Sequence, residues 1–185
     1  MKFAFYFGHP AQFVFARRTI EDLIEHKHEV LIQIKKKDVL EELLKSSKLE
    51  YTNIQPKERK NNRMAALLGL FSRNKIMLPA LRKFKPDLLI SSDASYSQLG
   101  LLLNTPCVTI LEDDYKVIKK LALLSYPFTS TILCPEVCQV GRWGKKKVGY
   151  KGYMKLAYLH PSVFQPNKNI KDKYTTHFQT YSLWK

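Results

Sequence analysis

The first 34 residues constrain the fold more than any other part of the chain. An apolar run at 2–7 leads into Gly8-His9-Pro10-Ala11, and an amphipathic segment then connects to a second apolar run at 29–34. This order predicts a buried strand, a tight turn, a helix and a second strand. A helix that begins directly after a buried strand presents backbone N–H donors and a partial positive charge. The turn therefore predicts a site for an anionic or polyhydroxylated ligand.

The same alternation continues through most of the chain. It predicts an α/β fold, a single Rossmann-like domain in which helices cover both faces of a parallel sheet. A length of 185 residues suits one domain with a substantial core. We expect residues 1–166 to form this domain and residues 167–185 to be a poorly packed or truncated tail. The strands are expected at about 2–7, 29–34, 50–54, 87–91, 107–111 and 131–134, and the helices at about 12–26, 38–47, 62–83, 94–103 and 114–124.

Composition narrows the location of the protein. No apolar run reaches the ~18–20 residues of a membrane span, and the N-terminus has no signal-peptide cleavage pattern. Cys107, Cys134 and Cys138 have neither zinc-site nor thioredoxin spacing, and each lies in or beside an apolar run. Buried reduced thiols in a cytoplasmic protein are the expectation.

The net charge of +15 is concentrated in two regions. Such clusters attract anionic lipid, phosphorylated substrates or nucleic acid. Because the chain has no helix-turn-helix, RNA-recognition or zinc-finger signature, nucleic acid is the weakest of these candidates. The cations of the first region are Lys57, Arg59, Lys60, Arg63, Arg73, Lys75, Arg82, Lys83 and Lys85, and those of the second are Arg142, Lys145, Lys146, Lys147, Lys151 and Lys155.

Polar side chains follow several of the predicted strands. In open parallel sheets, ligands bind beyond the carboxyl ends of the strands, so these side chains are the candidate site. We expect His9, Glu112 and Asp113 to be catalytic and Gly8, Asp93, Asp114 and Glu136 to bind substrate. No set of residues predicts a metal site.

Each candidate has a structural alternative. His9 could act as a general base or donate a hydrogen bond to substrate, or it could bond only its own turn. The acids at 112–114 could bind sugar hydroxyls, act as a base or hold a divalent cation, or they could cap the following helix, with Asp114 nearest that role. Asp93 could likewise cap the helix after it, and Asp38 the helix at 38–47.

The segment at 62–83 combines apolar and basic residues. It predicts either a helix that rests on an anionic membrane, with Arg63, Arg73 and Lys75 at the surface, or a packing helix with a solvated cationic face. Pro79 is expected to kink or end this helix. The run Lys145-Lys146-Lys147 is expected to be a solvated loop.

The order and spacing of several blocks resemble a known family over roughly residues 1–167. The blocks are FYFGHPAQFVF, HKHEVLIQIKKKDVLEELL, KFKPDLLISSDAS, TPCVTILEDD, YPFTSTILCPEV and GYKGYMKLAYLHPSVFQPN. The chain resembles the N-terminal half of the GT-B-like proteins of domain-of-unknown-function family 354. These are related to the peptidoglycan N-acetylglucosaminyltransferase and to the UDP-N-acetylglucosamine 2-epimerases.

The resemblance implies an enzyme built from two Rossmann-like domains. The C-terminal domain would hold a sugar-nucleotide donor of the UDP-sugar type, and the N-terminal domain would face a carbohydrate or lipid-linked acceptor. It places His9 in the first loop facing the cleft, and Glu112 and Asp113 in the acidic loop beyond the fifth strand. The chain would thus be the acceptor-side domain of a glycosyltransferase of cell-surface polysaccharide or glycoconjugate synthesis. Alone it would bind no cofactor and lack activity, and its place would be the cytoplasm or the inner face of the plasma membrane. The alternative is a non-enzymatic basic domain that binds anionic membrane or nucleic acid.

Overall fold

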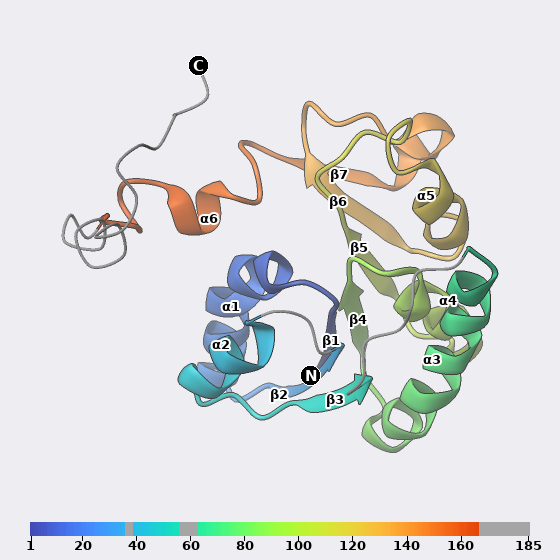
Figure 1. Cartoon of the computed structure of the whole chain (residues 1–185), viewed down its shortest axis with the longest axis horizontal. Coiled ribbons are helices and arrows are strands. Elements are labelled where there is room, and N and C mark those ends of the chain that lie inside the picture. The colour runs from blue at the N-terminus through green and yellow to red at the C-terminus, as the bar shows by residue number, and fades with distance from the viewer. Residues whose placement is uncertain (36–38, 56–62, 167–185) are drawn as a thin grey trace, which may run out of the picture.

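One parallel sheet of seven strands organises the chain (Figure 1). The computed structural model describes residues 1–35, 39–55 and 63–166, so the predicted tail at 167–185 lies outside the described residues. The strand order is β3-β2-β1-β4-β5-β6-β7, and every neighbouring pair is parallel. The strands are β1 (Lys2–Phe7), β2 (Glu29–Lys35), β3 (Thr52–Gln55), β4 (Leu88–Ser91), β5 (Cys107–Ile110), β6 (Thr131–Pro135) and β7 (Lys147–Tyr150).

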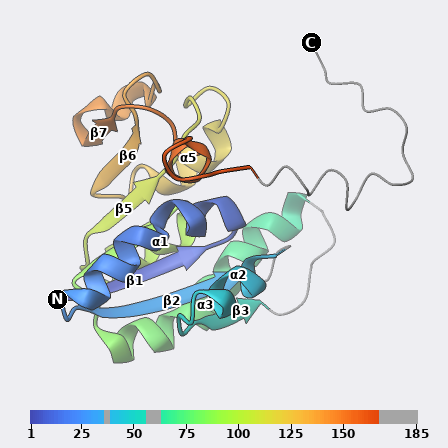
Figure 2. The ribbon, with the colours of Figure 1, turned by 90° about the vertical axis from the view of Figure 1, so that its left-hand side faces the viewer.

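Helices cover both faces of the sheet, as the sequence predicts (Figures 1 and 2). Alternate residues of β1 enter different cores, because successive side chains of a strand point to opposite faces. The helices are α1 (Pro10–Glu25), α2 (Leu40–Ser46), α3 (Arg63–Phe84), α4 (Ala94–Leu103), α5 (Lys119–Ser125), the 3₁₀ helix η1 (Gly141–Lys146) and the short helix α6 (Leu156–Leu159). Phe5 and Phe7 pack with α1 and α2, whereas Ala4 and Tyr6 pack with α3 and α4.

Six strands and five helices lie at or near their predicted positions, and the sequence-based prediction missed β7, η1 and α6. β7 was missed because its sequence, KVGY, is short, begins with lysine and contains glycine. The expected solvated loop at 145–147 is wrong, since Lys145 and Lys146 end η1 and Lys147 begins β7.

Two predictions about helix ends are wrong, and a third concerns a residue outside the described part of the chain. Pro79 does not end α3, which continues to Phe84, because its missing N–H removes only one helical hydrogen bond while Met77 and Leu81 stay fully buried. α5 begins at Lys119 rather than near Asp114, and its N-cap residue, Ile118, makes no side-chain cap bond. Asp38, the predicted cap of α2, lies outside the described residues.

Gly100 lets α4 pack closely on the sheet. A Cβ at this position would lie 2.8 Å from the Thr105 carbonyl oxygen and 3.3 Å from the Cys107 Cβ. Contact with a backbone atom cannot be relieved by a rotamer change. We therefore expect Gly100→Ala to lower the free energy of unfolding by about 1–3 kcal/mol, although alanine normally favours a helix by about 1 kcal/mol. Urea denaturation checks the sign, and a stabilised variant would show that α4 can shift outward.

Candidate functional site

The carboxyl ends of all seven strands lie at one edge of the sheet, because the strands are parallel. β1 and β4 are neighbours in the middle of the sheet. From β1 the chain continues to β2 on one side of this pair, and from β4 it continues to β5 on the other side, so the strand order reverses direction between β1 and β4. Ligands of doubly wound sheets bind at such a point. Gly8 and His9 follow β1 here, and Asp93 follows β4. We call Tyr6, Gly8, His9, Arg73 and Asp93 the switch-point site.

His9 is the N-cap of α1. Its backbone is extended, with φ −150° and ψ 141°, and its Nδ1 accepts a hydrogen bond of 3.2 Å from the Ala11 N–H. Since Nδ1 accepts, a neutral ring carries its proton on Nε2. The exposed edge of His9 therefore offers a hydrogen-bond donor rather than a base.

The backbone donors of this turn are already used. The Gly8 N–H donates to Gln12 Oε1 at 3.0 Å, and the Gln12 N–H donates to the His9 carbonyl at 3.1 Å. Pro10, the first residue of α1, has no N–H. The expectation that this helix start supplies free backbone N–H groups is thus wrong for Gly8, Ala11 and Gln12. Side chains must supply the donors for a ligand at this point.

Asp93 caps α4, which confirms the structural alternative given for it. Its Oδ1 accepts from the Ser95 N–H at 2.8 Å, and its own N–H donates to Ser91 Oγ at 2.9 Å. Arg73 Nη2 lies 3.2 Å from Asp93 Oδ2, and the two side chains are only 21% and 27% exposed. The cap and the ion pair fix the carboxylate at the switch point.

Arg73 therefore does not act as a free surface cation. It lies one helical turn before Met77, which is fully buried, so the two share the face of α3 that packs toward the sheet. Lys75 is exposed, whereas the side chain of Arg63 lies outside the described part of the chain.

Asp93 offers a matched pair of substitutions. Asp93→Ala should lower the free energy of unfolding by about 2 kcal/mol, because it removes the cap of α4 and leaves Arg73 without its carboxylate partner. Asp93→Asn keeps a good cap and should lose about half as much. Chemical denaturation of both variants measures the difference. An equal loss in the two would show that the cap contributes nothing.

The sequence-based prediction missed a group of buried polar atoms beside Asp93. Tyr6 Oη, Gln33 Nε2, Ser95 Oγ and Arg73 Nε are buried and have no hydrogen-bond partner in the described structure. A Cβ on Gly8 would lie 3.9 Å from Tyr6 Oη, so this hydroxyl reaches the first turn. An unmade buried hydrogen bond costs about 1–3 kcal/mol. These unmade bonds make the interior beneath His9 and Asp93 polar, and His9 and Asp93 are the groups of the switch-point site that a ligand can reach.

Tyr6 remains a donor throughout the ordinary pH range. Burial raises the pKa of its hydroxyl well above the usual value, and the nearby Asp93 raises it further. The sequence could have indicated these buried polar atoms through Gln33, because this polar residue interrupts the apolar strand of residues 29–34. Its Oε1 lies 3.0 Å from Tyr96 Oη, and that bond orients the free amide nitrogen.

The acids that follow β5 have three different environments. Asp113 is exposed, whereas Glu112 is about a quarter exposed and lies 3.8 Å from Lys155 Nζ. Asp114 Oδ1 accepts from the Gln139 N–H at 2.7 Å, so the expectation that Asp114 caps α5 is wrong. Its carboxylate instead ties this loop to the segment after β6.

The charge of Glu112 also affects the pKa of the neighbouring Tyr150. Tyr150 Oη is buried without a hydrogen-bond partner in the described structure. Burial, and then the charge of Glu112, raise the pKa of Tyr150 to about 12. Glu112, Lys155 and Tyr150 thus form a second polar group at the same edge of the sheet. In the described part of the chain, no hydrogen bond or ion pair joins His9 to Glu112 or Asp113.

Glu136 is exposed, and its backbone has a structural role. Its N–H donates to the Tyr150 carbonyl at 2.9 Å, and its carbonyl accepts from Lys147 Nζ at 2.7 Å. All three cysteines are free and buried, as predicted, and burial raises the pKa of the Cys107 thiol to about 12. Among the described residues, no group of three metal-ligating side chains is placed to hold a metal ion.

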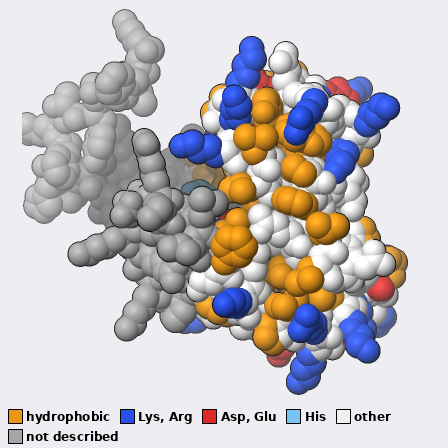
Figure 3. Space-filling view, turned by 90° about the vertical axis from the view of Figure 1, so that its right-hand side faces the viewer, with side chains coloured by type: hydrophobic (Ala, Val, Ile, Leu, Met, Phe, Trp, Pro, Cys, Tyr) orange, Lys and Arg blue, Asp and Glu red, His pale blue; other side chains and the backbone are white. Residues whose placement is uncertain are grey.

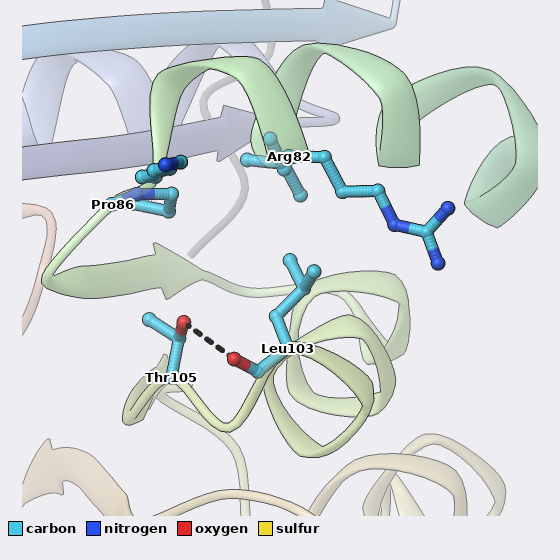
Figure 4. Close-up of a pocket in the computed structure, with 6 residues that line it drawn as sticks. Arg82, Pro86, Leu103 and Thr105 are labelled. Carbon is cyan, nitrogen blue, oxygen red and sulfur yellow. Dashed lines mark hydrogen bonds between the residues drawn. The ribbon is translucent and has the colours of Figure 1, made fainter.

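Two hollows lie at the opposite edge of the sheet. One, of about 200 Å³, is lined by Arg82, Lys85 and Pro86, which precede β4, and by Leu103 and Thr105, which precede β5 (Figure 4). Thr105 Oγ1 donates to the Leu103 carbonyl at 3.4 Å on its wall. The second, of about 310 Å³, lies beside it against Phe128 and Ser130. Neither hollow includes a predicted site residue.

Comparison with known proteins identifies the fold. No protein-family model and no curated protein matches the chain. Among solved structures, the UDP-GlcNAc 2-epimerase from Neisseria meningitidis bound to UDP-GlcNAc matches 96% of this chain and 53% of that chain, with a TM-score of 0.63 and 14% identity. The S. aureus MnaA–UDP structure matches 94% of this chain and 51% of that chain, with a TM-score of 0.65 and 13% identity.

A third solved structure gives the same result. MurG from Acinetobacter baumannii is similar over 82% of this chain and 44% of that chain, with a TM-score of 0.64 and 11% identity. The chain thus spans about half the length of the structures it matches. At these identities the likeness establishes the fold, which is the Rossmann-like half of a GT-B-type protein.

Proposed function

We propose that this chain is the acceptor-side domain of a GT-B-type glycosyltransferase that acts in cell-surface polysaccharide or glycoconjugate synthesis. In this proposal the chain belongs to domain-of-unknown-function family 354. A second domain holds the UDP-sugar donor, and without it the present chain has no activity. The acceptor is a carbohydrate or a lipid-linked sugar, and the protein works in the cytoplasm at the inner face of the plasma membrane.

The observation that carries the proposal is the set of unsatisfied polar groups at the switch point of a GT-B-type sheet. The exposed His9 Nε2–H can donate to an oxygen acceptor of a ligand, and the unpaired Tyr6 Oη and Arg73 Nε make the interior beneath it polar. Asp93, held by Arg73 and by the start of α4, can accept a hydrogen bond from a ligand hydroxyl. Sugars offer both kinds of group.

Because His9 carries its proton on Nε2, we assign orientation of the acceptor to His9 and removal of the acceptor proton to another residue. In glycosyl transfer the acceptor oxygen forms a bond to the sugar anomeric carbon, the bond from that carbon to the diphosphate breaks, and the acceptor hydroxyl loses its proton. His9 orients the acceptor through Nε2–H, and Glu112 or Asp113 receives the proton. Gly8, Asp93, Asp114 and Glu136 line the acceptor. Helix N-termini and basic side chains can neutralise the departing diphosphate, so the reaction needs no metal ion.

Two observations weaken the non-enzymatic alternative of a basic domain that binds nucleic acid. Arg73 is paired with Asp93, and the Nζ atoms of Lys146 and Lys147 are occupied by backbone carbonyls. Part of the positive charge therefore serves the fold.

Within the described residues, no helix is long and apolar enough to span a bilayer.

The DNA that follows codon 167 tests the two-domain part of the proposal. Translation in all three frames should reveal a second Rossmann-like domain, in the same frame or in a shifted one. An assay of UDP-sugar transfer would then use a protein that contains both domains. If no frame and no adjacent gene encodes such a domain, the proposal of half an enzyme fails.

A further inference from the structure

An apolar groove of about 300 Å³ lies beside α1, on the face of the sheet that α1 and α2 cover. The lining comes from α1 and from β1, β4, β5 and β6. Ten of the eleven lining residues are apolar, Thr19 of α1 is the exception, and none carries a charge. A ligand of this groove must therefore be a hydrocarbon. We call this hollow the α1 groove.

The sheet itself forms the floor of the α1 groove. Phe5 and Ile90 are nearly buried there, whereas Leu88 and Val108 stay partly exposed. A parallel sheet is normally covered on both faces, so this floor is unusual. On the opposite side of the molecule, shown in Figure 3, exposed apolar side chains such as Phe71 instead stand on the outer surface of helices.

The size of the α1 groove suits one hydrocarbon chain. A methylene group fills roughly the volume of a water molecule, ~30 Å³, so the groove holds about ten carbons, or about two isoprene units. Two turns of an α-helix, about 10 Å across and about 11 Å long, need more than twice this volume. A helix therefore cannot enter the groove, whereas a lipid chain can.

One end of the α1 groove approaches the candidate catalytic acids. Phe15 lines the groove, and its ring centroid lies 5.9 Å from that of Tyr150. Tyr150 belongs with Glu112 and Lys155 to the second polar group at the carboxyl edge of the sheet. The Lys155 side chain is 64% exposed and can contact an anionic head group. A ligand with a phosphate beside Lys155 can thus extend its chain along α1 from Phe15 toward Leu23.

We propose that the α1 groove binds the first isoprene units of a prenyl chain that carries the acceptor sugar. This inference rests on the proposed function, in which the acceptor is a lipid-linked sugar, and it adds the place where the lipid lies. The groove favours a prenyl chain over a saturated one, because double bonds leave fewer rotations to be lost on binding.

Calorimetric titration of this chain with prenyl monophosphates tests the proposal. The probes are dimethylallyl, geranyl, farnesyl and decyl phosphate, each below the concentration at which it forms micelles. Each buried methylene tightens binding about fourfold, so geranyl phosphate should bind at least about 30-fold more tightly than dimethylallyl phosphate. Farnesyl phosphate should gain no more than about threefold over geranyl phosphate, because the groove is then full. Decyl phosphate should bind at least about threefold more weakly than geranyl phosphate.

Thr19 offers a matched pair of substitutions. It lines the groove and is exposed, so it lies at the rim and tolerates a larger side chain. Thr19→Trp fills the groove and should weaken the binding of geranyl phosphate by at least about 10-fold. Thr19→Val keeps the shape of the side chain and should bind at least as tightly as the wild type. Ile76→Trp places the same indole on the exposed surface of α3 and should change nothing. Circular dichroism checks that every variant is folded.

Three results would overturn the proposal. Affinity that rises from geranyl to farnesyl as steeply as from dimethylallyl to geranyl, or that Thr19→Trp leaves unchanged, would indicate adsorption elsewhere on the surface. Equal affinity for decyl and geranyl phosphate would make the groove a site for saturated chains. A dimer in sedimentation equilibrium that Thr19→Trp abolishes would make it a contact between copies. Because the titration needs neither a UDP-sugar nor a second domain, its failure would leave the proposed glycosyl transfer standing.

Discussion

Replacing Lys146 with methionine should lower the free energy of unfolding by about 3 kcal/mol. Lys146 Nζ donates to the carbonyls of Tyr126, Pro127 and Thr129 at 2.9, 3.0 and 2.7 Å. These residues follow the last turn of α5, where carbonyls have no helical partner. A hydrogen bond from a charged donor contributes about 1.5–3 kcal/mol, and three bonds from one ammonium are not additive. The loss of all three therefore exceeds that of an ordinary surface substitution.

Lys145 provides the control for this experiment. It precedes Lys146 in η1 and is exposed, and Lys145→Met removes the same charge. Lys145→Met should change the free energy of unfolding by no more than about 0.5 kcal/mol. Urea denaturation of the two variants measures the contrast. Equal stability would mean that the Lys146 side chain does not hold the segment after α5.

His9→Ala should reduce turnover by about 100-fold in the two-domain protein that carries this domain, because the acceptor hydroxyl loses the donor that orients it. The alanine removes both the Nε2–H donor and the cap that Nδ1 gives the Ala11 N–H. His9→Asn separates these effects, because asparagine is a good N-cap but is too short to reach a ligand as histidine does. We expect His9→Asn to be as stable as the wild type and nearly as inactive as His9→Ala. Steady-state kinetics and thermal unfolding provide the two readouts.

His9→Gln distinguishes a donor from a base. Its terminal amide supplies an N–H donor but cannot accept a proton at neutral pH. If His9 orients the acceptor through Nε2–H, His9→Gln should recover part of the lost turnover and keep the shape of the pH profile. A variant as inactive as His9→Ala, with the acidic limb of the profile removed, would instead assign His9 as the base.

The strands could be predicted because their signal is local. β1, β2 and β4 are short apolar runs bounded by turn residues, and each lies within about one residue of its expected position. β7 could not be found in this way, because it pairs only with β6 at the margin of the sheet. The role of Lys146 was also out of reach, since its three acceptors lie 17 to 20 residues earlier in the chain.

In the candidate site, too, local features could be predicted and contacts between distant residues could not. That Gly8, His9 and Asp93 lie at one edge follows from the parallel sheet alone. The Arg73–Asp93 pair does not, because it depends on how α3 packs beside α4. Asp114 was assigned to the nearest helix, but its partner is the Gln139 N–H after β6. Local sequence thus located the strand ends, whereas tertiary packing determined the partner of each side chain.

A nuclear magnetic resonance titration of this chain with a soluble prenyl-diphosphate-linked sugar tests the central claim most directly. If the switch-point site binds the acceptor, the amide signals of Gly8, Ala11 and Ser95 should shift in a saturable way, and His9→Asn should weaken that binding about 10-fold or more. A UDP-sugar should produce much smaller shifts, because the donor belongs to the second domain. Shifts that centre on Arg82, Leu103 and Thr105 at the opposite edge, or no saturable shift at the switch point, would contradict the account.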